Sequence, residues 1–176
     1  ASAEVMKLAK GLIELGVSEG DHVAVIGRNR PYLYWSLLAA QHLGAVPVPL
    51  YQDAVADEME YILTHSNAAY AIVGDQEQVD KIQDLSRKLT NLKDIVYVDP
   101  KGLRKYDKAH LHSFESILEA GDKSGDNVQK ELQTRIDKIT GQSTCVLIYT
   151  SGTTGKSKGV VQTHGAIIGA SRSANE

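Results

Sequence analysis

The chain has 176 residues, 42% of them hydrophobic, which is enough to bury a complete core and is typical of one domain. Nineteen Lys and Arg residues against 22 Asp and Glu give a formal net charge of -3, so the chain lacks an overall basic field and we expect no nucleic-acid partner. The single cysteine, Cys145, excludes an internal disulfide and favours the reducing cytoplasm, and no apolar stretch approaches the roughly 18 residues of a membrane span.

The first hundred residues predict alternating helices and strands. Apolar residues recur at intervals of three and four between Val5 and Leu15, as in an amphipathic helix. The later elements are a strand at 22–27, a helix at 31–44, an extended segment at 45–50, a helix at 54–67, a strand at 69–74, a helix at 76–89 and a strand at 94–99. Because helices separate the strands, the pattern predicts an α/β fold with a mostly parallel sheet and helices on both faces.

The remaining residues carry a weaker pattern until the chain nears its end. The segment 101–143 is rich in charged residues and predicts two helices, one near 113–119 and one near 126–138. The run "TCVLIYT" at 144–150 predicts a buried strand, and "KGVVQT" predicts another strand before a helix that starts at His164. The loop between these two strands is therefore the segment to inspect for chemistry.

Neither end of the chain carries the signals of a natural terminus. The sequence opens without an initiator Met, already inside or just before a helix, and it stops without a capping glycine or proline. We expect both ends to be internal to a longer polypeptide.

The loop "TSGTTGKSKG" at 150–159 combines the three groups that a polyphosphate site needs. Glycines let the backbone approach a ligand, hydroxyls add side-chain donors, and lysines supply positive charge. Ser, Thr and Gly also crowd ordinary tight turns, so a surface turn is the simpler alternative, and the buried strand predicted just before the loop argues against it.

A Walker phosphate loop is the first alternative. "GKS" at 155–157 copies the end of that motif, but Thr150 stands where the motif requires glycine. A Walker lysine also opens a helix, whereas a strand is predicted here. A Walker kinase or phosphatase would release orthophosphate, so the reaction product separates this alternative from the one that follows.

The run "YTSGTTGKSKGV" at 149–160 resembles the signature of the adenylate-forming, or AMP-binding, enzymes. It matches every defined position of that signature, which begins with Tyr or Phe, except Ser157, where the family has proline. Losing proline frees φ at a cost on the order of 0.4–1 kcal/mol of chain entropy, which predicts a looser loop that keeps all its donors. The stretch 8–51 is similar to the opening region of the family, and 48–82 is similar to bacterial long-chain fatty-acid CoA ligases.

The resemblance implies a two-step reaction. A carboxylate attacks the α-phosphorus of ATP to give an acyl-adenylate and pyrophosphate, and coenzyme A then displaces AMP to form a thioester. It also implies Mg2+ as a cofactor, a fatty acid as the acyl donor, and peripheral membrane association as an option for the complete enzyme. The implied nucleotide-binding residues are Thr150, Ser151, Gly152, Thr153, Thr154, Gly155, Lys156 and Lys158, with Lys158 as the catalytic cation and Lys156 at the variable position of the signature.

The same resemblance makes residues 1–176 the front part of the N-terminal AMP-binding domain, with the phosphate loop at 149–159. The acidic Mg2+ ligand, the acyl pocket and the C-terminal lid domain would then lie beyond residue 176, so the metal ligands and the acyl chain length are not given by this sequence. We expect this fragment to be inactive alone and to self-associate. Two alternatives stay open: a ligase for an aryl or amino acid, and a non-catalytic nucleotide-binding protein.

Other polar residues have simpler interpretations. Cys145 is expected in the core, and His110 and His112 are expected in a solvated loop without a third metal ligand. His164 is expected either to face the nucleotide or to pack at the start of a helix.

Overall fold

The computed structural model describes residues 2–150 and 156–173. Its helices are α1 (Ser2–Glu14), α2 (Pro31–His42), α3 (Ala56–His65), α4 (Gln76–Asp84), α5 (Phe114–Lys123), α6 (Asp126–Lys138) and α7 (His164–Ser173). Its strands are β1 (His22–Ile26), β2 (Val46–Leu50), β3 (Tyr70–Val73), β4 (Asp94–Tyr97), β5 (Leu111–Ser113), β6 (Thr144–Thr150) and β7 (Lys158–Thr163). Every helix and strand expected from the sequence is present, and the structure adds β5 and the short 3-10 turn η1 (Leu103–Lys105).

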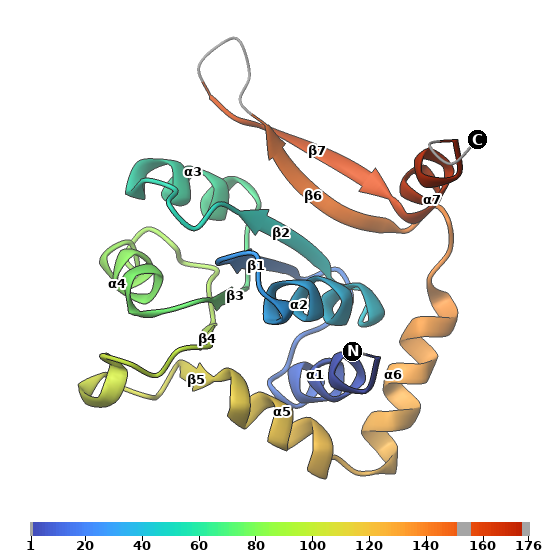
Figure 1. Cartoon of the computed structure of the whole chain (residues 1–176), viewed down its shortest axis with the longest axis horizontal. Coiled ribbons are helices and arrows are strands. Elements are labelled where there is room, and N and C mark those ends of the chain that lie inside the picture. The colour runs from blue at the N-terminus through green and yellow to red at the C-terminus, as the bar shows by residue number, and fades with distance from the viewer. Residues whose placement is uncertain (1, 151–155, 174–176) are drawn as a thin grey trace.

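Five strands form one parallel sheet in the order β2-β1-β3-β4-β5 (Figure 1). From β1 the chain moves to β2 on one side and then returns to β3 on the other side. Strand β5 has only three residues, which is too short for any sequence period to reveal it, and it is recognised by its pairing with β4.

Successive residues of β1 face opposite sides of the sheet, as in any strand. Val23 and Val25 belong to the core under α1, α2 and α5, whereas Ala24 and Ile26 belong to the core under α3 and α4. Both cores are closed, because the side chains of all four residues are fully buried. The expected parallel sheet with helices on both faces is therefore confirmed.

Strands β6 and β7 form a separate antiparallel hairpin that lies beside β2 (Figure 1). The expectation of a buried strand at 144–150 is wrong for most of its length, because only Cys145 and Val146 are buried there. Ile148 is 37% exposed and Val161 is 60% exposed. The apolar run suggested a central strand, but the hairpin lies outside the parallel sheet. Of β6, only Cys145 and Val146, near its start, are buried.

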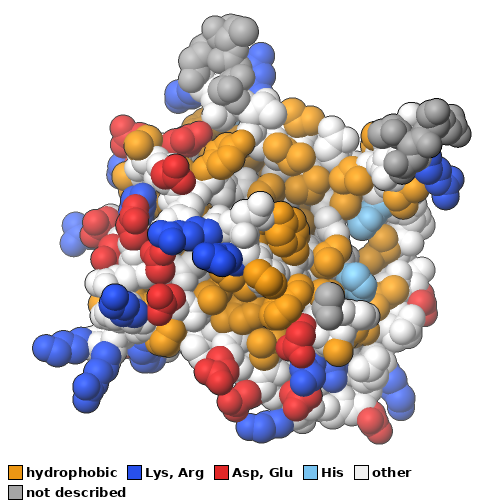
Figure 2. All heavy atoms as spheres, viewed as in Figure 1, with side chains coloured by type: hydrophobic (Ala, Val, Ile, Leu, Met, Phe, Trp, Pro, Cys, Tyr) orange, Lys and Arg blue, Asp and Glu red, His pale blue; other side chains and the backbone are white. Residues whose placement is uncertain are grey.

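Hydrophobic side chains gather on the face that carries β2, α2 and the hairpin (Figure 2). Helix α7, which follows the hairpin, has no buried residue among those described. Self-association of the isolated chain, which the sequence led us to expect, stays a prediction. None of the described helices is long and apolar enough to cross a membrane.

Helices α1 and α5 pack closely because glycines meet at their interface. A Cβ on Gly121 would lie 1.8 Å from the carbonyl oxygen of Lys7, and a Cβ on Gly11 would lie 2.0 Å from the carbonyl oxygen of Ile117. Both obstacles are backbone atoms, which cannot turn aside as a side chain can. The two helices can approach this closely only with glycine at both positions.

We expect Gly121→Ala to lower the free energy of unfolding by about 1–3 kcal/mol, because the added methyl group forces α1 and α5 apart. Urea unfolding of the chain measures this change. Gly169→Ala in α7 is the matched control, since a Cβ there meets nothing within 4 Å. Equal stability of the two variants would contradict the close packing.

Candidate functional site

The predicted phosphate loop connects the two strands of the hairpin. Thr150 ends β6, Lys158 begins β7, and their Cα atoms are partners in the strand register. Thr150, Lys156 and Lys158 are all exposed at this tip. The other predicted residues, Ser151, Gly152, Thr153, Thr154 and Gly155, lie outside the described residues.

Helix α3 supplies side chains next to this tip that the sequence did not single out. The phenol oxygen of Tyr149 and Nδ1 of His65 are 2.7 Å apart and share a hydrogen bond. The ring of Tyr61 stacks on His65 at 5.3 Å and meets Tyr149 edge-on at 6.3 Å. Burial, and then the neighbouring Tyr61, raise the pKa of Tyr149, so its phenol stays protonated at neutral pH. We call Tyr61, His65 and Tyr149 the aromatic cluster.

One sequence signal could have indicated the α3 half of this cluster. Tyr61 and His65 are four residues apart on a helix, so they share a face. The buried residues Met59, Ile62 and Leu63 define the opposite face. What the spacing could not reveal is that this exposed face meets the hairpin, since 84 residues separate His65 from Tyr149.

A pocket of about 510 Å³ lies between α3 and the start of β7. It is lined by Tyr61, His65, Lys156, Ser157, Lys158 and Gly159. The ammonium group of Lys156 lies 5.4 Å from the centre of the Tyr61 ring, within the range of a cation–π contact. Two ammonium groups, a hydroxyl and an imidazole around one pocket suit a multiply charged anion.

Acidic side chains limit where such an anion can bind. The neighbouring groove along α3 contains Asp57, Glu58 and Glu60 as well as Lys88. Lys88 Nζ lies 2.7 Å from a carboxylate oxygen of Glu60, so its charge is engaged there. Lys156 also lines the groove, but the three carboxylates there outnumber the cations, so phosphate is favoured at the end formed by Lys156 and Lys158.

No group of three or more His, Cys, Asp or Glu side chains in the described parts of the chain is arranged to hold a metal ion. His110 and His112 lie 3.3 Å and 3.0 Å from the same carboxylate oxygen of Asp94. They do not share a solvated loop as expected, because His112 belongs to β5 and is only partly exposed.

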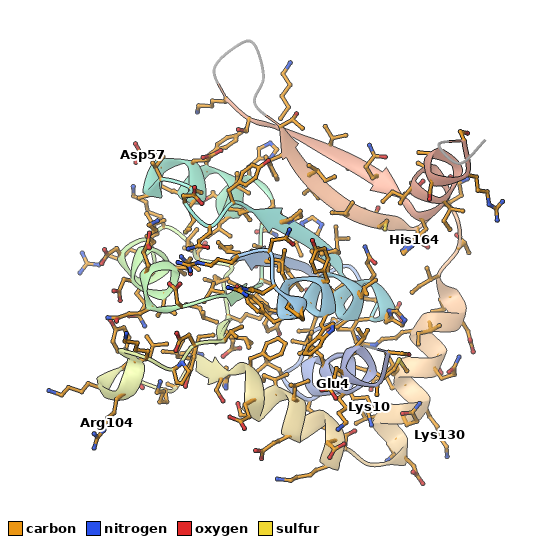
Figure 3. All side chains as sticks on the ribbon, viewed as in Figure 1. Glu4, Lys10, Asp57, Arg104, Lys130 and His164 are labelled. Carbon is orange, nitrogen blue, oxygen red and sulfur yellow. The ribbon has the colours of Figure 1, made fainter. Side chains whose placement is uncertain are left out.

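His164 does not come near the predicted phosphate loop. It follows Thr163, at the end of β7 opposite Lys158, which is about 15–20 Å along a six-residue strand. Figure 3 places it at the far end of the hairpin from α3, and its backbone N–H donates to the carbonyl of Ser143 at 3.1 Å. Burial lowers the pKa of His164, with a further contribution from His42. The structure favours the helix-start role.

Comparison with known proteins decides the family. The sequence matches the AMP-binding enzyme family over residues 1–175. The chain is a member of that family. It is 30% identical over 155 residues to the long-chain-fatty-acid–CoA ligase ACSBG1 of Rattus norvegicus, covering 88% of this chain but 21% of that protein. The AMP-binding chain thus spans about a fifth of the length of this curated relative.

Solved structures share the fold of this AMP-binding chain. The anthranilate CoA ligase AuaEII in complex with anthranoyl-AMP superposes with a TM-score of 0.74 at 25% identity, over 93% of this chain and 29% of that one. The inhibitor-bound N-terminal domain of FACL13 from Mycobacterium tuberculosis superposes with a TM-score of 0.69 at 26% identity, over 92% of this chain and 36% of that one. The α/β architecture is that of the N-terminal domain of adenylate-forming enzymes.

Cys145 is expected to react slowly with thiol reagents. Its side chain is buried, its Sγ lies 3.1 Å from Nε2 of Gln41, and burial raises the pKa of the thiol. We expect iodoacetamide to label the folded chain at least about tenfold more slowly than the urea-unfolded chain at pH 8. In the folded chain a smaller fraction of Cys145 is thiolate, and the sulfur is buried away from the reagent. Cys145→Ser gives the background, and equal rates would contradict the burial.

Proposed function

We propose that this chain is part of an acyl-CoA ligase that activates a long-chain fatty acid with ATP, releases pyrophosphate and then forms the coenzyme A thioester. One observation carries the proposal: the adenylate-forming signature spans the hairpin tip, where Lys156 and Lys158 line a pocket suited to an anion. The family membership of the chain supports the same reaction class.

In this proposal the hairpin tip holds the leaving group. Negative charge gathers on pyrophosphate as its bond to the α-phosphorus breaks, so donors and cations fixed at that point lower the barrier. The proposed phosphate ligands are Thr150, Ser151, Gly152, Thr153, Thr154, Gly155 and Lys156. Lys158 is the proposed catalytic cation, placed at the first residue of β7, where strand pairing fixes its backbone.

In this proposal the lid domain and the Mg2+ ligands belong to other parts of the polypeptide. We propose that residues 1–176 form part of an AMP-binding domain and that the lid domain lies elsewhere. No group of three or more His, Cys, Asp or Glu side chains among the described residues is arranged to hold a metal ion, so we assign no Mg2+ ligand to them. The inactivity of the isolated chain, its cytoplasmic location and the membrane association of the complete enzyme remain predictions.

The acyl substrate has two candidates. The relative from Rattus norvegicus is a long-chain-fatty-acid–CoA ligase, which supports a fatty acid. The structural neighbour AuaEII is an anthranilate CoA ligase, which supports an aryl acid as the second candidate. Both use the carboxylate in the same chemical role, so the proposed function of the hairpin tip is the same for either.

The first test is carboxylate-dependent exchange of labelled pyrophosphate into ATP by the complete polypeptide that contains this chain. We expect exchange with long-chain fatty acids and not with anthranilate. Exchange only with anthranilate or an amino acid would keep the chemistry and replace the substrate. Orthophosphate release without exchange would contradict the proposal and favour a Walker-type reaction.

Lys158→Met is expected to lower the rate of this exchange by roughly 10- to 100-fold, because it removes a charge-assisted contact to the leaving group. The matched control is Lys130→Met on α6, an exposed lysine remote from the hairpin tip (Figure 3). If both variants lost the same activity, Lys158 would not have the proposed role.

A further inference from the structure

The signature of this chain lacks the one residue that would stiffen the hairpin tip by itself. Proline fixes φ near −65°, and Ser157 stands in its place between Lys156 and Lys158. Without proline, the backbone ahead of β7 has more conformations to lose when the tip is ordered. Contacts from outside the tip can supply the same kind of restraint on the described residues that flank it.

Helix α3 contacts both arms of the hairpin tip. On the β6 arm, His65 shares the 2.7 Å hydrogen bond with Tyr149, the residue before Thr150. On the β7 side, the ring of Tyr61 lies under the ammonium group of Lys156, the residue before Ser157. Tyr61 also touches both other rings of the aromatic cluster, so a single group of side chains engages the described residues on each side of the segment 151–155.

Helix α3 is a firm support for such a contact. Its opposite face is anchored in the core by Met59, Ile62 and Leu63, which are at most 4% exposed. Gly159, across from Tyr149 in the register, adds room, because a Cβ there would come within 3.3 Å of Cζ of Tyr149. The Tyr149 ring can therefore pack across β7 and still reach α3.

The hydroxyl of Tyr149 is the group that joins the hairpin to His65 of α3. The signature accepts Tyr or Phe at the first position, so the chemistry does not require a hydroxyl there. In this chain the hydroxyl is used to contact His65. We propose that Tyr61 and His65 of α3 are positioning residues that clamp the two arms of the hairpin tip and supply the restraint that proline supplies elsewhere. The clamp rests on the proposed function for its effect on catalysis.

His65 also lines the pocket, so it could instead contact the phosphates itself. The two roles have different consequences. A positioning residue acts through Tyr149, so its loss duplicates the loss of the Tyr149 hydroxyl and is relieved when the tip is stiffened in another way. A direct phosphate contact acts independently of Tyr149 and of residue 157.

The first experiment measures pyrophosphate–ATP exchange by the complete polypeptide with Tyr149→Phe, His65→Leu and the double variant. Each single variant should raise the KM for ATP by roughly 3- to 10-fold with a smaller change in kcat, which is the range of one net hydrogen bond. The double variant should be no worse than the worse single variant. His65→Asn, whose amide oxygen can accept the Tyr149 hydroxyl, should recover most of the loss.

Adding Ser157→Pro to His65→Leu should restore the KM to within about twofold of the parent, because proline fixes the same backbone from within. Tyr51→Phe is the matched control for loss of a phenol hydroxyl, since Tyr51 is 83% exposed and lies outside the aromatic cluster. It should leave the KM unchanged. The clamp would be overturned if the increases in KM of Tyr149→Phe and His65→Leu multiplied in the double variant. It would also be overturned if neither Ser157→Pro nor His65→Asn restored the KM.

A second measurement does not depend on activity. Amide hydrogen exchange of the peptide covering residues 156–163 should be faster in Tyr149→Phe and His65→Leu than in the parent, while peptides from α1 and α5 stay unchanged. Unchanged exchange at 156–163 would overturn the clamp whatever the enzyme does. The two variants could show faster amide hydrogen exchange than the parent while the parent shows no pyrophosphate–ATP exchange. That result would uphold the clamp and reject the proposed function.

Discussion

The structure depends on the burial of both faces of one parallel sheet. Backbone groups of parallel strands are paired within the sheet, so stability comes from covering the side chains that project from each face. Val23 and Val25 project from one face of β1, and Ala24 and Ile26 project from the other. Two layers of helices are needed, and the close contact of Gly11 and Gly121 lets α1 and α5 fit within one of them.

The hairpin that carries the candidate site lies outside this sheet, and β6 packs beside β2 at its edge. Near its base, Gln41 Nε2 donates to the backbone carbonyl of Cys145 at 3.0 Å. Near its tip, Tyr149 meets His65 and Tyr61 of α3. The central sheet thus supports the hairpin directly, where β6 packs beside β2, and also through α2 and α3. Such an arrangement leaves Thr150, Lys156 and Lys158 exposed at the described ends of the two strands.

Charge places the candidate site at one end of α3. Lys156 and Lys158 lie at the hairpin tip, whereas Asp57, Glu58 and Glu60 line the neighbouring groove. Lys156 lines both spaces, and the groove adds three carboxylates, so a polyanion is favoured at the end formed by Lys156 and Lys158. Membership of the AMP-binding family supports a nucleotide as the proposed ligand of this site.

The sequence by itself determined the order of elements, the α/β class and the position of the candidate loop, because hydrophobic periodicity and a run of Gly, Ser, Thr and Lys are local properties. It could not reveal β5, which is recognised only by pairing with β4, nor that "TCVLIYT" forms an outer hairpin, since an apolar run looks the same in either place. Tertiary structure alone brought His65 to Tyr149 and separated His164 from the loop. Contacts between distant residues depend on how the layers pack, and no local pattern encodes that packing.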